Sequence, residues 1–303
     1  VEAGRLAVQS EDLPRPRTVA PGAPVILEAH NLTMEYPGPP PVVALRDVNI
    51  QIHQGEFVGI VGQNGSGKST LVKCFVGLLR PKKGEVLFRG ESIRKFSVGE
   101  IARRVGLVLQ NPDYQLFTAS CRDEIRFGLR NVGVPAEEME ERIEEALRMV
   151  GLSEEAELFP FRLSFGDRRK LAVAATIALD PEVLIMDEPT TAQDHRGRYQ
   201  LAELARRFHE EKQGTVLMIT HDVDLIARYA HRLVVLYEGQ MLLDGPTAEV
   251  FMQVEELEKS FVVPPVAAQL AAELAPLGVP PQVMTLEELY QILVPQPERG
   301  EGM

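Results

Sequence analysis

Cysteine, basic charge and long apolar runs are all scarce in this sequence, and each absence excludes a class of protein. The two cysteines, Cys74 and Cys121, have neither metal-ligand spacing nor a disulfide framework, so we expect both to be reduced packing residues of a cytosolic protein. The formal net charge is −12 and no basic patch is evident, so we expect no nucleic acid partner. The longest apolar run, 171–179, is much shorter than the ~18 residues of a membrane-spanning helix.

The composition that remains is that of a globular protein. Hydrophobic residues make up 45% of the 303 residues and charged residues 25%, which permits a sizeable core and one to two domains. No signal peptide is evident, which predicts that the protein is not secreted. Such a protein can still lie beneath a membrane by holding a membrane protein.

Residues 25–252 predict an α/β fold. Apolar runs typical of strands occur at 25–36, 44–52, 56–62, 85–90, 105–109, 182–187, 215–220, 231–237 and 240–244. Helical patterns occur at 69–79, after a capping box formed by Ser97 and Glu100, and at 135–150, 166–179, 196–212 and 222–230. Because strands alternate with helices, we expect a mainly parallel sheet with helices on both faces.

The two ends of the chain differ from this main domain. Residues 1–24 are polar and contain several prolines, which predicts a linker. The chain starts with Val1, which is consistent either with a processed or trimmed N-terminus or with a piece cut from a longer tandem protein. Residues 253–303 predict a small helical appendage, with an alanine-rich helix after Pro265 and a second helix capped by Thr285 and Glu288.

A glycine-rich segment lies between the strand 56–62 and the helix that follows. Residues 62–69, GQNGSGKS, fit the phosphate-binding pattern G-x-x-x-x-G-K-[ST] in the strand-to-helix context that it requires. Its glycines let backbone N–H groups surround phosphates, and the helix N-terminus adds partial positive charge. We expect Lys68 to bridge the β- and γ-phosphates of ATP and Ser69 to ligate Mg²⁺. The predicted ATP-binding residues of this P-loop are Gly62, Asn64, Gly65, Ser66, Gly67, Lys68, Ser69 and Thr70.

Two carboxylates end the apolar strand 182–187. Ligands bind at the carboxyl edge of open α/β sheets, where we expect Asp187 to hold Mg²⁺ and Glu188 to act as the general base on the attacking water. His221 follows the strand 215–220 and is expected beside the γ-phosphate. The predicted catalytic residues from these strand ends are thus Glu188 and His221.

With these motifs in place, residues 25–252 resemble an ATP-binding cassette (ABC) ATPase, and further positions match that family in order. They are Tyr36 as the aromatic on adenine, Gln110 as the loop glutamine that senses Mg²⁺ and water, 163–167 (LSFGD) as the signature, Asp194 as the D-loop aspartate and His221 as the switch histidine. The resemblance implies a P-loop NTPase fold with an added antiparallel β subdomain and a helical subdomain at about 111–165. A P-loop alone would also admit kinases, GTPases and helicases.

The resemblance also implies that two such chains enclose two ATP molecules, with Ser164 and Gly166 of one chain facing the P-loop of the other. Phe165 stands where the family has its first signature glycine, and Asp167 replaces Gln or Glu, so we expect a working but slower site. Gln193 and His195 stand where Leu and Pro are common in the D-loop, which affects communication between the two sites rather than ATP binding.

Residues 110–128 narrow the resemblance to the ATPase subunits of energy-coupling factor (ECF) transporters and the related cobalt and nickel uptake systems. The stretch runs QNPDYQLF and then DEIRFG, and the tail after Val262 is also similar. The resemblance implies that the cluster of Tyr114, Leu116 and Phe117 contacts a transmembrane coupling subunit, that a substrate-binding membrane subunit is contacted only indirectly, and that the C-terminal appendage helps to pair two ATPase chains.

The leading hypothesis is therefore an ATP-hydrolysing motor subunit for the uptake of a vitamin or metal ion, located peripherally on the cytoplasmic face of the cell membrane. The alternatives are the ATPase subunit of another class of ABC transporter, a soluble ABC ATPase that does not drive transport, and a nucleotide-binding partner without catalytic activity. The presence of Lys68, Asp187, Glu188 and His221 argues against the last of these.

Overall fold

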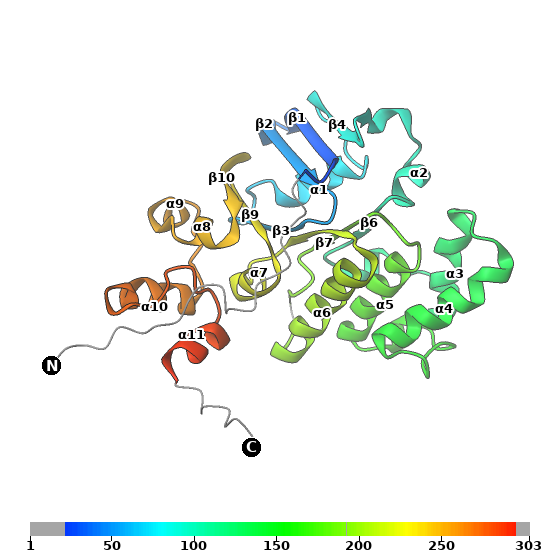
Figure 1. Cartoon of the computed structure of the whole chain (residues 1–303). Coiled ribbons are helices and arrows are strands. Elements are labelled where there is room, and N and C mark those ends of the chain that lie inside the picture. The colour runs from blue at the N-terminus through cyan, green and yellow to red at the C-terminus, as the bar shows by residue number, and fades with distance from the viewer. Residues whose placement is uncertain (1–21, 192, 295–303) are drawn as a thin grey trace, which may run out of the picture.

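The computed structural model describes residues 22–191 and 193–294 (Figure 1). Within these residues, two β-sheets lie close together and helices surround the larger one. No helix in this part of the chain combines the length and the apolar character that crossing a membrane requires.

The larger sheet has six strands in the order β10-β9-β3-β8-β7-β6, and it is parallel except for the pairing of β9 with β10. Its strands are β3 (Phe57–Val61), β6 (Val105–Val108), β7 (Val183–Asp187), β8 (Thr215–Ile219), β9 (Arg232–Tyr237) and β10 (Gln240–Pro246). Every residue of β3, β7 and β8 is buried, because helices or the second sheet cover both faces. The predicted α/β class is confirmed.

The smaller sheet is antiparallel, with the order β2-β1-β4-β5. Its strands are β1 (Val25–Tyr36), β2 (Val42–His53), β4 (Lys83–Phe88) and β5 (Glu91–Ser92). A hydrophobic cluster joins this sheet to helix α1 (Lys68–Phe75) and to one face of the larger sheet. Helix α1 ends before residue 79, the predicted limit, because Gly77 adopts a left-handed conformation with φ 71°.

The remaining helices of the main domain pack on the larger sheet or extend from it (Figure 1). They are α2 (Val98–Ala102), α3 (Cys121–Asn131), α4 (Ala136–Val150), α5 (Phe165–Ile177), α6 (His195–Lys212) and α7 (Val223–Tyr229), with short 3-10 turns η2 (Ile93–Lys95), η3 (Pro112–Tyr114) and η4 (Pro160–Arg162). The capping box of Ser97 and Glu100 is confirmed at the start of α2.

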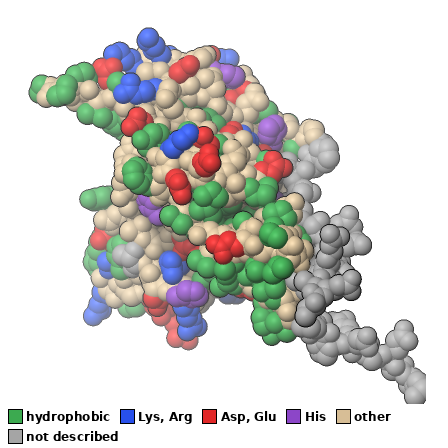
Figure 2. All heavy atoms as spheres, turned by 90° about the vertical axis from the view of Figure 1, so that its left-hand side faces the viewer, with side chains coloured by type: hydrophobic (Ala, Val, Ile, Leu, Met, Phe, Trp, Pro, Cys, Tyr) green, Lys and Arg blue, Asp and Glu red, His purple; other side chains and the backbone are tan. Residues whose placement is uncertain are grey.

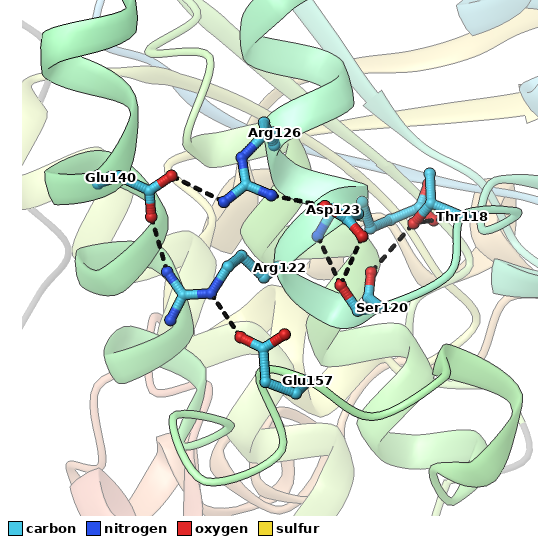
Figure 3. A network of polar contacts seen from close by, with 8 residues as sticks. Thr118, Ser120, Arg122, Asp123, Arg126, Glu140 and Glu157 are labelled. Carbon is cyan, nitrogen blue, oxygen red and sulfur yellow. Dashed lines mark hydrogen bonds and ion pairs between the residues drawn. The ribbon is translucent and has the colours of Figure 1, made fainter.

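Helices α3 and α4 form an arm beside α5, and a polar network fixes the start of α3 (Figure 3). Arg122 pairs with Glu140 of α4 and with Glu157, while Arg126 pairs with Glu140 and Asp123. Charged pairs on a surface are each worth less than about 1 kcal/mol, but a connected set also fixes geometry. The network therefore holds the first turns of α3 against α4 and against the segment that carries Glu157.

The chain ends in α8 (Thr247–Phe251), α9 (Val254–Lys259), α10 (Val266–Leu274), the 3-10 turn η5 (Ala275–Leu277) and α11 (Leu286–Leu293). The predicted capping box of Thr285 and Glu288 is confirmed, and α10 and α11 share a small hydrophobic cluster. Hydrophobic side chains gather on the lower half of the face that carries α8, α9 and α10 (Figure 2). The large hydrophobic residues of the appendage that are more than half exposed are Phe261, Val263, Val266, Leu277, Leu286 and Tyr290.

Candidate active site

The P-loop connects β3 to α1 through three glycines with positive φ. Gly62 has φ 143° and Gly67 has φ 103°, and a Cβ at these positions would lie 2.1 Å from the Leu236 carbonyl and 2.5 Å from the Ala44 carbonyl. At Gly65, with φ 82°, a Cβ would meet no atom within 4 Å. No side chain caps the N-terminus of α1, so its N–H groups remain available to an anion.

Lys68, the first residue of α1, is buried with its ammonium group turned back over the loop. Its Nζ donates to the carbonyl oxygens of Gly62, at 2.6 Å, and Gln63, at 3.0 Å. Burial lowers the pKa of Lys68, while the negative charges of Glu188 and Asp187 oppose that shift. The P-loop therefore holds a desolvated cation at its centre, which suits an anionic ligand.

Ser69 and Asp187 join the P-loop helix to the end of β7. The Ser69 hydroxyl donates to Oδ1 of Asp187 at 3.0 Å. Burial raises the pKa of Asp187, and the Ser69 hydrogen bond together with the charges of Lys73 and Lys68 pulls it down. A hydroxyl and a carboxylate at this separation are the oxygen donors that Mg²⁺ prefers, so the residues present fit a magnesium ion.

Glu188 follows β7 in a left-handed conformation with φ 49°, which is uncommon for a residue with a side chain. Its N–H donates to the Ile219 carbonyl at 2.9 Å, and its Oε1 lies 3.0 Å from Nε2 of His221. Burial raises the pKa of the Glu188 carboxyl; the Lys68 charge opposes this and the Asp187 charge adds to it. The Nε2 atom of His221 also lies 2.9 Å from Oδ1 of Asn64, so the P-loop and the end of β8 meet at this carboxylate.

Most of these groups line one hollow of about 420 Å³, which we call the P-loop hollow, whereas the predicted site residues Gly62, Ser66 and Asp187 do not line it. Among the predicted site residues, the structure brings together around it Tyr36, Asn64, Gly65, Gly67, Lys68, Ser69, Thr70, Gln110, Glu188 and His221. The Tyr36 hydroxyl lies 3.2 Å from that of Thr70, which places the aromatic ring at the edge of the hollow.

The predicted signature and D-loop residues do not line this hollow. Ser164 is exposed and caps α5, accepting from the Asp167 N–H at 3.1 Å, while Asp194 caps α6 through the Gly197 N–H at 2.7 Å. Gly166 lies beside Gln193, so the signature and the D-loop share one surface. Phe165, the first residue of α5, lies with its ring 5.0 Å from the Arg169 guanidinium.

Two residues near the hollow were not singled out from the sequence. Thr191 lines it and its side chain hydrogen-bonds the Glu188 carboxylate. Arg169 is buried on α5 and donates to the carbonyl oxygens of Gln110 and Pro189. Helical spacing in the sequence could have indicated that Arg169 is buried. Arg169 precedes the buried residues Val173 and Thr176 by four and seven positions, so it lies on the buried face of α5.

An apolar groove of about 360 Å³ lies beside α3. The positions of the three side chains of the predicted docking cluster show that the prediction was partly wrong. Tyr114 is 82% exposed and Phe117 62% exposed, and both line the groove. Leu116, in contrast, is 2% exposed and belongs to the hydrophobic core, because in this irregular segment its side chain turns inward. The predicted surface cluster therefore contains Tyr114 and Phe117 but not Leu116.

Comparison with known proteins agrees with this geometry. Residues 45–191 match the family model described as ABC transporter. The chain is 41% identical over 251 residues to the energy-coupling factor transporter ATP-binding protein EcfA2 of Caldanaerobacter subterraneus subsp. tengcongensis, covering 81% of this chain and 88% of that protein. It is also 41% identical over 250 residues to a putative ABC transporter ATP-binding protein of Methanosarcina mazei, covering 82% of this chain but only 42% of the relative. The chain thus spans about two fifths of the length of that longer relative.

Solved structures of similar fold include cbiO1 of Clostridium perfringens, described as part of the ABC transporter complex cbiONQ, with a TM-score of 0.69 and 32% identity over 84% of this chain and 98% of that one. Another is an ATP-binding cassette in a dimeric post-hydrolysis state with ADP and Pi, with a TM-score of 0.67 and 27% identity over 73% of this chain and 99% of that one. The resemblance inferred from the motifs is confirmed. The chain belongs to the ABC transporter family, within the group of energy-coupling factor transporter ATP-binding proteins.

Proposed function

We propose that this chain is the ATP-hydrolysing motor subunit of an ECF-type membrane transporter that takes up a vitamin or metal ion. The observation that carries the proposal is the P-loop hollow, which Lys68, Ser69 and the Glu188–His221 pair line together and to which Asp187 is joined by its hydrogen bond with Ser69. A phosphate-binding loop without a base would serve binding alone, but here a buried carboxylate lies beside it.

Within this proposal, Glu188 is the general base that takes a proton from the attacking water. Its pKa is raised by burial, which makes the carboxylate a better proton acceptor near neutral pH. His221 contacts Glu188 and Asn64 through the same nitrogen, and this arrangement orients both side chains toward the hollow. Tyr36, at the edge of the hollow, is placed to stack on the adenine ring of ATP.

We assign the magnesium ion to Ser69, Asp187 and Gln110. The first two are already hydrogen-bonded to each other, and Gln110 lines the same hollow. When bound, Mg²⁺ neutralises the charge that develops on the transferred phosphoryl group.

The proposal includes a dimer with two composite sites. The exposed Ser164 and the half-buried Gly166 lie at the start of α5, and neither lines the P-loop hollow of its own chain. A helix N-terminus that faces solvent can bind the phosphates held by a second chain. The solved dimer of a similar cassette with ADP and Pi supports this arrangement, and the exposed apolar residues of the C-terminal appendage offer a second contact between the chains.

The apolar groove is the proposed docking site for a helix of the transmembrane coupling subunit. Leu78, Val98, Tyr114, Phe117 and Phe127 all line it and are all substantially exposed. Phe117 packs edge-to-face against Phe127 of α3 at 4.9 Å, and the buried Glu124 carboxylate accepts from the N–H groups of Phe117 and Thr118. Docking here would place the chain peripherally on the cytoplasmic face of the membrane, with indirect contact to the substrate-binding subunit.

The test is to coexpress the chain with candidate coupling and substrate-binding subunits, purify the complex and reconstitute it in vesicles. The wild-type complex should accumulate its substrate when Mg-ATP is supplied, whereas a complex with Glu188→Gln should assemble equally well and transport little. Uptake that needs no ATP, or that continues at the wild-type rate in the Glu188→Gln complex, would refute the motor role.

A further inference from the structure

Arg169 is a buried cation on a helix whose other buried positions carry uncharged side chains. It is 3% exposed, in the first turns of α5, and the other buried positions of that helix carry Leu, Ala, Val, Ile and Thr. Burying a guanidinium is strongly unfavourable unless hydrogen bonds compensate it, and a carboxylate partner is the usual solution. Among the described residues no carboxylate lies within 4.0 Å of it.

The guanidinium instead uses two backbone carbonyls from separate segments. One terminal nitrogen donates to the Gln110 carbonyl at 2.9 Å, and the other donates to the Pro189 carbonyl. Its Nε has no hydrogen-bond partner, and the ring of Phe165 lies 5.0 Å from the guanidinium carbon. A cation over an aromatic face is stabilised electrostatically, so Phe165 gives Arg169 a partner that the glycine of the family pattern could not.

The two carbonyls belong to segments whose separation determines the geometry of the site. Gln110 follows β6, and Pro189 immediately follows Glu188, whose own backbone is held in the left-handed region. Strand β6 pairs directly with β7, so a rigid fork between the ends of these strands fixes Gln110 relative to Glu188. Arg169 also lies on α5, the helix that begins directly after the signature residue Ser164.

We infer that Arg169 is a positioning residue for ATP hydrolysis, which holds Gln110 and Glu188 at the spacing that the reaction needs and ties both to the signature helix. This inference rests on the proposed function. Arg169 does not line the P-loop hollow, so it acts through the two segments that it joins. A displacement of about 1 Å of a catalytic group can cost roughly 100-fold in rate, so loss of the fork should reduce kcat far more than ATP affinity.

The test compares Arg169→Met and Arg169→Lys with Val173→Ala, which removes core packing from the same buried face one turn further along α5. We expect Arg169→Met to lower kcat by about 30- to 100-fold while the Kd for ATP changes less than about threefold. Arg169→Lys keeps the charge but replaces the two separate donor nitrogens of the fork by a single ammonium nitrogen, and should recover part of the lost rate. Val173→Ala should lower the melting temperature and leave kcat within about twofold of wild type.

A second readout separates positioning from a general loss of stability. If Arg169 acts through Glu188, then Arg169→Met in a Glu188→Gln background should lower the residual rate by less than about threefold, because there is no base left to place. The inference is overturned if Arg169→Met lowers kcat by the same factor in both backgrounds. If the Met variant does not fold, Arg169→Lys replaces it in the test. Hydrolysis of ATP at the wild-type rate by Arg169→Lys also overturns the inference. Absence of hydrolysis in the wild-type chain would instead refute the proposed function itself.

Discussion

His221 and Glu188 are in direct contact, with 3.0 Å between Nε2 of the histidine and Oε1 of the carboxylate. The same Nε2 lies 2.9 Å from Oδ1 of Asn64, and because both neighbours are acceptors, the ring proton belongs on this nitrogen. Burial, together with the Lys68 charge, lowers the pKa of His221, which favours the neutral ring. The contact therefore links the P-loop, β7 and β8 at one carboxylate.

Replacing Lys68 by alanine should weaken nucleotide binding before any chemistry. Hydrogen bonds to a charged group contribute roughly 1.5–3 kcal/mol each, so the Kd for ATP should rise by about tenfold or more. Calorimetric titration would measure this, with Lys95→Ala as the control because that ammonium is 66% exposed and far from the P-loop hollow. An unchanged Kd in Lys68→Ala would count against the P-loop assignment.

Arginine at Ser164 should stop hydrolysis while ATP still binds to the single chain. The reason is geometric, since Ser164 lies outside the P-loop hollow of its own chain and is placed to complete the site of a partner. Ser164 also caps α5, and loss of a cap costs about 1 kcal/mol, so Ser164→Ala, which removes the hydroxyl and the cap without adding bulk or charge, is the control for the arginine.

A mixture of two inactive variants extends this test. Ser164→Arg chains keep an intact P-loop, and Lys68→Ala chains keep an intact signature, so each mixed dimer contains one complete site. The mixture should release phosphate faster than either variant alone. If Ser164→Arg alone hydrolyses ATP normally, the signature has no part in the mechanism.

Two adjacent side chains should respond in opposite ways to the same change. Phe117→Asp places a carboxylate in the apolar groove, where the loss of an interface hot spot commonly costs ~2 kcal/mol or more of binding free energy. The variant should therefore fail to copurify with its membrane subunit. It should still fold and hydrolyse ATP. Leu116→Asp buries an unpaired charge in the core and should unfold the protein. Melting curves and copurification decide between these outcomes, and normal assembly of Phe117→Asp would place docking elsewhere.

His231 should make the protein less stable as the pH falls. Burial, helped by the charge of His209, lowers the pKa of His231 to about 4, and its Nδ1 accepts the Phe57 N–H at 3.0 Å. The unfolded chain binds this proton at an ordinary pKa of about 6.5, so between pH 6.5 and 4 the free energy of unfolding should decrease by up to about 3 kcal/mol.

Urea unfolding at several pH values would measure this effect. The control is His231→Asn, whose side-chain oxygen can still accept the Phe57 N–H but cannot titrate. It should lose that part of the acid sensitivity, and an identical pH dependence in both proteins would contradict the role given to His231.

The parts of this structure that sequence could predict are those encoded locally. Buried strands ending in Asp187 and Glu188, the P-loop glycines and the capping boxes at Ser97 and Thr285 all depend on neighbours a few residues away. Leu116 and Phe117 could not be separated, because they lie in an irregular turn without a period that assigns one side chain to the core. The hydrogen-bond acceptors of Arg169 are main-chain carbonyls that lie 59 and 20 residues away in the sequence. Every residue has a main-chain carbonyl, so the residue types could not indicate these contacts.

Glu188, as the base of an ATPase, is the residue on which the proposed mechanism rests. Phosphate release should be measured for the wild-type chain and for Glu188→Gln, with Mg-ATP, alongside ATP binding and the oligomeric state. The wild type should turn over, and the variant should be slower by ~10²–10⁴-fold, the usual contribution of general-base catalysis, while ATP binds and holds a stable dimer. Wild-type turnover in Glu188→Gln, or no magnesium-dependent hydrolysis by the wild type, would contradict the account.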